Sequence, residues 1–302
     1  MDENVKQLLK EKDKRIYELE KSINEIGSDL AENFYQTIEL LTSIISFTER
    51  GYDGSHARFV SDKSEAMAKL MGLRRNTQYE IKLAGLFHAI GKISFKDSNL
   101  FKYPHEMTKQ EYNQFVLYPK ISVEILKNHR GFIKILDIVY QHNEKLDGSG
   151  FPKGLKGDEI HPGARIIAVV DAYHNLVFKK VREHSNKNVT YTNTHALLEA
   201  SKDRHKSACK FLESKRKIWF EPNLVDAFIV MMELERTDLS DKQIVRVPVN
   251  KVEIGMIFAQ DYHSSFGLLI ASKGEKVSES MIKPLVSFAE NNEIPHKILM
   301  LA

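Results

Sequence analysis

The sequence lacks several features that would assign it to a particular class of protein. One cysteine, Cys209, occurs in 302 residues, which excludes an internal disulfide and a Cys-x-x-Cys metal motif. There is no run of about 18 apolar residues, so we expect no membrane-spanning helix. The first residues contain no apolar signal-peptide core, so we expect a cytoplasmic protein. Basic residues exceed acidic ones by only 44 to 41, and a net charge of +3 does not argue for DNA or RNA as a partner.

The composition that is present suits a folded globular protein. Hydrophobic residues make up 42% of the chain and charged residues 28%. The length indicates about two domains as a soft prior. Twelve histidines are a rich supply for this length, so a metal site is worth seeking.

Residues 1–35 have the pattern of a coiled coil. Apolar residues recur at alternating steps of three and four, Lys12 fills one position of this seam, and the flanking residues are charged. The seam consists of Val5, Leu9, Ile16, Leu19, Ile23, Ile26 and Leu30. Phe34 and Ile38 follow at steps of four, which indicates a stutter. We expect a homodimer through this helix; the alternative is a single amphipathic helix packed on its own domain.

Residues 36–234 are predicted to form an all-α domain. Helical periodicity runs through Ala57–Met71, Tyr79–Ile90, Lys109–Lys127, Ile133–His142 and Gly163–Phe178. Residues 179–217 look like a polar, exposed insertion followed by a helix. Residues 222–234 begin with proline and predict a closing helix.

Residues 242–302 are predicted to form a small α+β domain. Alternating and β-branched residues predict strands at 244–249, within 263–277 and at 296–301, with a helix at 280–290. The fold class expected for the whole chain is therefore mainly α, with a coiled-coil helix first and this small domain last.

The polar residues that could bind a metal or take part in catalysis fall in five segments between residues 50 and 175. Each segment is weak evidence alone, because an isolated histidine near a helix is more often structural than a ligand. Their order and spacing carry the signal. The residues concerned are His56; His88 and Lys92, four apart and expected on one helix face; Tyr118 before a proline; His142, Asn143 and Glu144 before a glycine-rich turn; and Asp171 and His174, three apart on a helix.

These segments resemble the HD-GYP family, a branch of the HD phosphohydrolases. The family pattern is GH, HDIGK, a His before Pro, HHExxDGxGYP and ARI…DAYDA; this chain has SH, HAIGK, YP, HNEKLDGSGFP and ARI…DAYHN, and FEPNLVDAF also matches. The resemblance covers about two thirds of the chain. It implies an all-α fold, two or three bound metal ions and hydrolysis of cyclic dinucleotides, chiefly cyclic di-GMP.

Carried over position by position, the resemblance implies a metal-ligand set that is only partly kept. His56, His88, His142 and Asp171 are competent ligands, and His174 offers a further one. The family's ligands are replaced by Ala89, Tyr118 and Asn143. Alanine removes the carboxylate that would bridge two dications, so we expect no stable binuclear centre. One Fe or Mn ion held by two histidines and one carboxylate is the hypothesis that remains, and no metal at all is the alternative.

The resemblance implies that the ligand-facing residues are better preserved. Lys92 keeps the lysine that the family uses near phosphate, and it would be the catalytic residue if the protein is active. Further candidate ligand-binding residues are Asp147, Gly148, Gly150, Phe151 and Arg165, although the glycines also suit a plain tight turn. The family's RPY segment is not found; residues 178–186 take its place.

Three functions remain open from the sequence. The first is a catalytically inactive regulator in cyclic di-GMP signalling, which binds a protein partner and cyclic di-GMP. The second is an active metal-dependent cyclic di-GMP phosphodiesterase with a reduced metal site. The third is a scaffold that binds neither. Ala89 favours the first and third over the second, and Lys92 with Arg165 favours the first over the third.

Overall fold

The computed structural model describes most of the chain, with several gaps. The described residues are 3–49, 56–95, 100, 102–179, 181–182, 191–192, 203–240, 243–265, 269–271, 274, 276–277 and 279–301. The chain divides into two compact units, residues 1–43 and 44–302. Each unit is described by itself.

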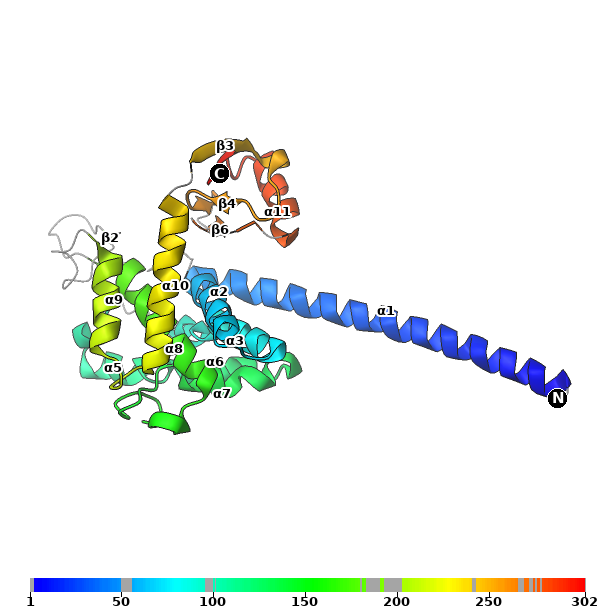
Figure 1. Cartoon of the computed structure of the whole chain (residues 1–302), viewed down its shortest axis with the longest axis horizontal. Coiled ribbons are helices and arrows are strands. Elements are labelled where there is room, and N and C mark those ends of the chain that lie inside the picture. Colours follow the sequence, from blue (N-terminus) through cyan, green and yellow to red (C-terminus); the bar gives the residue numbers. More distant parts are fainter. Residues whose placement is uncertain are drawn as a thin grey trace. The chain divides into compact units, whose positions relative to one another are not determined.

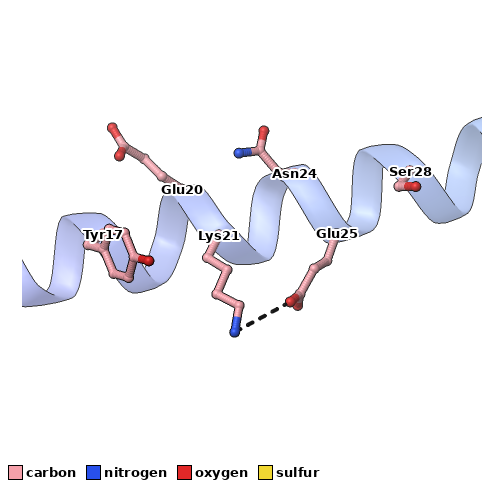
Figure 2. A pocket seen from close by; sticks show the side chains of 6 residues that line it. All are labelled: Tyr17, Glu20, Lys21, Asn24, Glu25 and Ser28. Carbon is pink, nitrogen blue, oxygen red and sulfur yellow. Dashed lines mark ion pairs between the residues drawn. The ribbon is translucent and has the colours of Figure 1, made fainter.

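The first unit lies within one long helix, α1 (Glu3–Thr48) (Figure 1). The predicted seam residues from Leu9 to Leu30 are exposed, and Leu30 is 70% exposed. The Val5 side chain lies outside the described residues. An ion pair joins Lys21 to Glu25, one helical turn further along, at 3.8 Å on the helix surface (Figure 2). The residues drawn there line a shallow pocket, and all of them belong to α1.

Three helices form the centre of the second unit. These are α2 (His56–Leu70), α3 (Arg75–Phe87) and α8 (Pro162–Phe178), and α2 packs against both of the others. Their facing side chains are fully buried, as hydrophobic packing requires. α8 also contacts α9 (Arg204–Ser214) and α10 (Pro222–Ser240). Buried residues of this core include Val60, Ile81, Phe87, Ile167, Val170 and Phe228.

Shorter elements connect these helices and shape the site. In chain order they are the 3-10 helices η2 (Ile90–Ser94) and η3 (Pro104–Glu106), α5 (Lys109–Phe115), α6 (Tyr118–Leu126), η4 (Arg130–Ile135), α7 (Leu136–Gln141) and η5 (Gly157–Glu159). The predicted helix 109–127 is thus two helices, and Pro119 stands in the first turn of the second, where its missing N–H costs nothing.

The prediction that His88 and Lys92 share one helix face is wrong. α3 ends at Phe87, and Lys92 lies in η2. The reason is a close approach at Gly91, whose N–H donates to Ser122 Oγ at 2.9 Å. A Cβ on Gly91 would lie 2.2 Å from the Tyr118 carbonyl oxygen. The backbone leaves the helix here because it docks directly on α6.

One short pair of strands differs from the prediction of an all-α domain. β1 (Val181–Arg182) and β2 (Tyr191–Thr192) pair antiparallel over two residues. They fall within the predicted polar insertion, whose residues 183–190 and 193–202 lie outside the described part. The substitute for the RPY segment, 178–186, lies largely outside it too.

The last part of the chain has the predicted α+β composition. β3 (Ile244–Pro248), β7 (Lys297–Leu301) and β4 (Ile257–Phe258) form an antiparallel sheet in that order. β5 (Tyr262–His263) pairs with β6 (Leu269–Ala271), and η6 (Val249–Lys251) and α11 (Glu279–Glu290) complete the element list. Its own hydrophobic core includes Phe258, Val277, Leu285, Ile298 and Met300. The predicted mainly-α fold class with a small α+β part is confirmed; the domain boundaries stay predictions.

Among the helices described, none combines the length and apolar character that crossing a membrane requires.

Candidate metal centre

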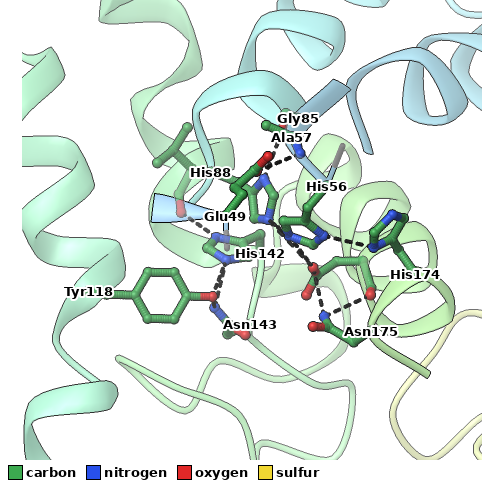
Figure 3. Close-up of polar contacts among 12 residues, drawn as sticks. Glu49, His56, Ala57, Gly85, His88, Tyr118, His142, Asn143, His174 and Asn175 are labelled. Carbon is green, nitrogen blue, oxygen red and sulfur yellow. Dashed lines mark hydrogen bonds and ion pairs between the residues drawn. The ribbon is translucent and has the colours of Figure 1, made fainter. Parts of the chain in front are cut away.

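Two histidines and one aspartate converge at the centre of the second unit. His56 begins α2, His88 follows the end of α3, and Asp171 lies in the middle of α8 (Figure 3). His56 Nε2 is 3.1 Å from His88 Nε2 and 3.2 Å from Asp171 Oδ1, and His88 Nε2 is 3.5 Å from the same oxygen. All three ligand atoms lie within 4.8 Å of one another. This is the arrangement of donors around a single cation.

Hydrogen bonds behind the ligands fix which atoms face the centre. His88 Nδ1 lies 2.7 Å from the Gly85 carbonyl oxygen and donates its N–H to that oxygen, so Nε2 faces inward. Asn175 Nδ2 donates to Asp171 Oδ1 at 2.8 Å. Metal-binding side chains are commonly held by such outer partners.

His174 lies behind His56, on the far nitrogen of its ring. The two Nδ1 atoms are 3.0 Å apart, whereas His56 faces Asp171 and His88 through Nε2 (Figure 3). The sequence suggested His174 as an additional metal ligand. The geometry suits an orienting partner of His56 instead, although its metal role stays a prediction.

Burial keeps this centre in the protonation state that a cation needs. Burial lowers the pKa of His56 to about 3, despite the nearby Asp171 carboxylate. It also lowers the pKa of His174 well below its usual value. For Asp171, burial alone would raise the pKa, but hydrogen bonds with His56 and His88 outweigh it and hold the pKa well below the usual range. Near neutral pH the centre therefore offers neutral His56 and ionised Asp171.

The other half of the site is a closed hydrogen-bonded cluster. His142 Nδ1 lies 2.6 Å from the Val139 carbonyl oxygen and must donate to it, so Nε2 accepts. The Tyr118 hydroxyl lies 2.7 Å from that Nε2, and Asn143 Nδ2 lies 2.7 Å from it and 2.5 Å from the hydroxyl (Figure 3). Tyr118 and His142 are each 1% exposed. The lone pair of His142 is thus occupied by protein donors.

Residue 89 is the third position at which the family resemblance implies a metal ligand, and here it offers no ligand atom. Ala89 is buried directly after His88 and contributes only a methyl group. Ser122 of α6 donates to the His88 carbonyl oxygen at 3.1 Å and accepts the Gly91 N–H. The backbone around Ala89 is therefore held firmly even though the bridging carboxylate is gone.

Lys92 is half-buried beside both halves of the site. Its Nζ lies 4.9 Å from the centre of the Tyr118 ring. Removal from water lowers the pKa of Lys92, while Asp171 and Glu49 act in the opposite direction. Lys92 thus lies beside the Tyr118 ring of the second half, and burial favours the neutral form of its amine.

Sequence reasoning missed two residues of this centre. Glu49 is buried, and its Oε1 accepts the Ala57 N–H at 2.7 Å in the first turn of α2. Burial raises the pKa of Glu49 to about 8. No spacing rule joins it to His56. Asn175 could have been found, because it lies one helical turn after Asp171.

The glycine-rich turn is largely explained by its own packing. Gly148 has φ of +80°, and a Cβ on Gly150 would lie 2.5 Å from the Asn143 carbonyl oxygen. Asp147 Oδ1 accepts hydrogen bonds from the N–H and hydroxyl of Ser149. Phe151 lies edge-on to the Tyr118 ring, at 6.3 Å between ring centres. Gly150 thus lies against the Asn143 backbone and Phe151 against the Tyr118 ring, and the predicted ligand-binding roles stay predictions.

Arg165 is engaged in contacts that fix α8 to its neighbours. Its Nη1 lies 3.0 Å from Glu221 Oε2, and Nε donates to the Ile160 carbonyl oxygen at 3.1 Å. These bonds give Arg165 a structural function; its predicted role in ligand binding stays a prediction.

The sequence matches the HD domain family over residues 5–206, and the chain belongs to that family. The predicted membership of the HD phosphohydrolase superfamily is thereby confirmed.

Relatives with assigned names are cyclic dinucleotide phosphodiesterases. The chain is 29% identical over 233 residues to "Cyclic di-GMP phosphodiesterase" of Thermotoga maritima, covering 76% of this chain and 58% of that one. It is 31% identical over 165 residues to "Cyclic di-GMP phosphodiesterase response regulator RpfG" of Xanthomonas campestris, covering 54% and 43%. The chain thus spans about half the length of these relatives.

A solved HDG"Y"P protein from Bdellovibrio bacteriovorus matches with a TM-score of 0.46 and 19% identity, over 59% of this chain and 51% of that one.

The residues present fit one metal ion. The first half directs two imidazole nitrogens and one carboxylate oxygen at a common point, a set known to hold Fe(II). The second half fits no further ion, because Tyr118 and Asn143 occupy the His142 lone pair.

Proposed function

We propose that this chain is an HD-GYP-type regulator that binds a cyclic dinucleotide and a protein partner, holds at most one metal ion and does not hydrolyse the dinucleotide. The observation that carries the proposal is the Tyr118–His142–Asn143 cluster, which stands where a second ion would need open donors. Cytoplasmic cyclic di-GMP signalling is the setting we propose for it.

The small number of carboxylates at the site supports the proposal that hydrolysis is lost. Two-metal hydrolases clamp the attacking and leaving oxygens with ions about 3.5–4 Å apart. Two dications this close require bridging carboxylates to offset their repulsion, and Ala89 supplies none. Asp171 is the one ionised carboxylate among the described ligand atoms of the site.

A single Fe or Mn ion would be held by His56, His88 and Asp171. Such an ion, when bound, can polarise a phosphoryl oxygen or activate a water. The Gly85 carbonyl oxygen holds the outer nitrogen of His88, and Asn175 donates to Asp171 Oδ1, the oxygen that also faces the two histidines.

Cyclic dinucleotide binding is supported by the charge and aromatic surface beside that ion. Lys92 presents an ammonium group suited to phosphate, and Phe151 offers a ring on which a base could stack. The relatives' names point to the same class of ligand.

The experiment measures turnover and binding on one preparation. With Mn(II) or Fe(II) added, we expect no conversion of cyclic di-GMP to linear product. Calorimetry should detect binding below about 100 µM, which corresponds to about −5.5 kcal/mol. Turnover that His88→Ala abolishes would overturn the proposal. Absence of any binding heat would leave a scaffold that binds no nucleotide.

A reduced but active phosphodiesterase is the second candidate, favoured by the three retained ligands and the names of the relatives. It predicts that one equivalent of metal restores turnover, and the same assay decides it.

Dimerisation through residues 1–35 is part of the proposal. The exposed apolar stripe of α1 is the supporting observation. Sedimentation of the chain should give a dimer, and deletion of residues 1–35 should give a monomer.

A further inference from the structure

A second group of metal-binding side chains lies where α8, α9 and α10 pack together, away from the residues of the first centre. His205 Nε2 is 2.8 Å from Glu233 Oε1 and 3.6 Å from Cys209 Sγ. The nitrogen, sulfur and oxygen atoms all lie within 4.8 Å of one another. The function proposed above makes no use of these residues.

Helix geometry places these donors together. His205 and Cys209 are four residues apart on α9, so both side chains lie on the same helix face. Glu233 comes from α10, which packs against α9. His205 and Cys209 are buried, whereas the Glu233 side chain is 59% exposed. The group therefore has two fixed donors inside and one carboxylate at a solvent-accessible mouth.

Tyr173 of α8 supports the histidine from behind. Its hydroxyl lies 2.7 Å from His205 Nδ1, and its ring packs edge-on against Phe228. When His205 Nδ1–H donates to this hydroxyl, the Nε2 lone pair faces Glu233, and Cys209 Sγ lies beside the ring, 3.6 Å from Nε2 and 3.9 Å from Nδ1. An oxygen acceptor on the far nitrogen is a frequent partner of metal-binding histidines.

We propose that His205, Cys209 and Glu233 form a second metal site, selective for Zn²⁺ or a similarly thiophilic divalent cation. Zinc bonds of about 2.05 Å to nitrogen and about 2.3 Å to sulfur, at a tetrahedral angle, separate the two donors by about 3.6 Å. The observed distance from Cys209 Sγ to His205 Nε2 is also 3.6 Å, but Sγ is 3.9 Å from Nδ1, so the Cys209 side chain has to turn towards the Nε2 lone pair when an ion binds. The tetrahedral nitrogen–oxygen separation is about 3.3 Å, so the exposed Glu233 carboxylate has to withdraw by about half an ångström.

The donor set distinguishes this site from the first centre. Thiolate sulfur selects softer ions, whereas two imidazoles and a carboxylate suit Fe or Mn. An ion bridging α9 and α10 would also connect the helices that flank α8. Three protein ligands leave a fourth tetrahedral position for water.

Cobalt titration tests the proposal with a signal that only this site can give. Cys209 is the one cysteine of the chain, so a thiolate-to-cobalt charge-transfer band in the near ultraviolet must come from it. With Co²⁺ alone as probe, we expect the full-length protein to show this band and to lose it when Zn²⁺ displaces the cobalt. Cys209→Ser should abolish it.

Two variants separate a built site from a metal held by the thiol alone. Glu233→Gln, at an exposed carboxylate, and Tyr173→Phe should each weaken cobalt binding on the order of 10- to 100-fold. Glu213→Gln makes the same change at an exposed carboxylate on α9. It is the matched control and should leave the affinity unchanged. A wild-type titration without the band would overturn the proposal, as would a band that neither Glu233→Gln nor Tyr173→Phe weakens.

Discussion

The two halves of the central site contain similar residues, but their inward-facing atoms have different partners. His56, His88 and Asp171 direct their donor atoms at one point, where a cation is the natural occupant. His142 has the same inward orientation, fixed by the same kind of Nδ1 bond to a carbonyl three residues earlier. Its inner nitrogen, however, meets the Tyr118 hydroxyl and the Asn143 amide.

The comparison shows that two buried histidines with the same outer hydrogen bond can have different partners on the inner nitrogen. An unpaired buried polar atom costs about 1–3 kcal/mol, so a site that loses its ion needs another donor. Tyr118 and Asn143 supply that donor in the second half. In the first half, the inner nitrogens of His56 and His88 face each other and Asp171.

The largest expected effect comes from rebuilding the second half. Ala89→Asp with Tyr118→His and Asn143→His restores the carboxylate and two imidazoles. We expect the metal bound at this centre to rise from at most one to two equivalents and hydrolysis of cyclic di-GMP to appear. Metal analysis in a Cys209→Ser background keeps the second site out of the count. A triple variant without additional metal would show that these positions are not ligand positions.

Removal of one ligand from the first half should abolish its metal binding. His88→Ala leaves one histidine and one carboxylate, and we expect Fe(II) content after anaerobic preparation to fall below about a tenth of an equivalent. His296→Ala, at an exposed position of the last domain, is the control. Equal iron in His88→Ala and wild type would place the ion elsewhere.

A buried lysine near the first half should make its stability depend on pH. Burial lowers the pKa of Lys179 to about 7, below its ordinary value of 10.5. Between these values the unfolded chain binds more protons than the folded one, so wild-type stability rises with pH. Lys179→Met removes this dependence. We expect the variant to melt several degrees above wild type near pH 7 and the difference to shrink towards pH 10.

Thermal melts at a series of pH values provide the measurement. A difference in Tm that stays constant from about pH 7 to about pH 10 would contradict the depressed pKa of Lys179.

The smallest expected effect comes from disturbing the second half without rebuilding it. Tyr118→Phe keeps the ring but removes the hydroxyl shared by His142 and Asn143. We expect a loss of about 1–2 kcal/mol in the free energy of unfolding and unchanged metal content. Tyr112→Phe, at an exposed ring, is the control. A change in metal content would show that the halves are coupled.

Order and spacing in the sequence predicted most of the central site. His56, His88, His142 and Asp171 converge as expected, and so do the replacements Tyr118 and Asn143. Glu49 could not be predicted, because no sequence spacing rule links its carboxylate to the Ala57 N–H. The helix end at Phe87 was also missed, because apolar periodicity continues past it while the contact of Gly91 with α6 decides the backbone.

The sequence already contained part of the evidence for the proposed second metal site. His205 and Cys209 have the i, i+4 spacing that puts two ligands on one helix face. Glu233 lies 24 positions after Cys209, and only the packing of α10 on α9 brings it near.

Gly91 has a consequence for how such a protein can change over generations. Ala89, where the family resemblance implies an aspartate, is buried in the fold without offering a metal ligand. Any side chain at Gly91 would collide with the backbone of α6. Selection for folding alone therefore preserves the glycine after selection for chemistry has ended. Descendants that have lost every ligand would keep this part of the motif, and sequence searches would continue to group them with active enzymes.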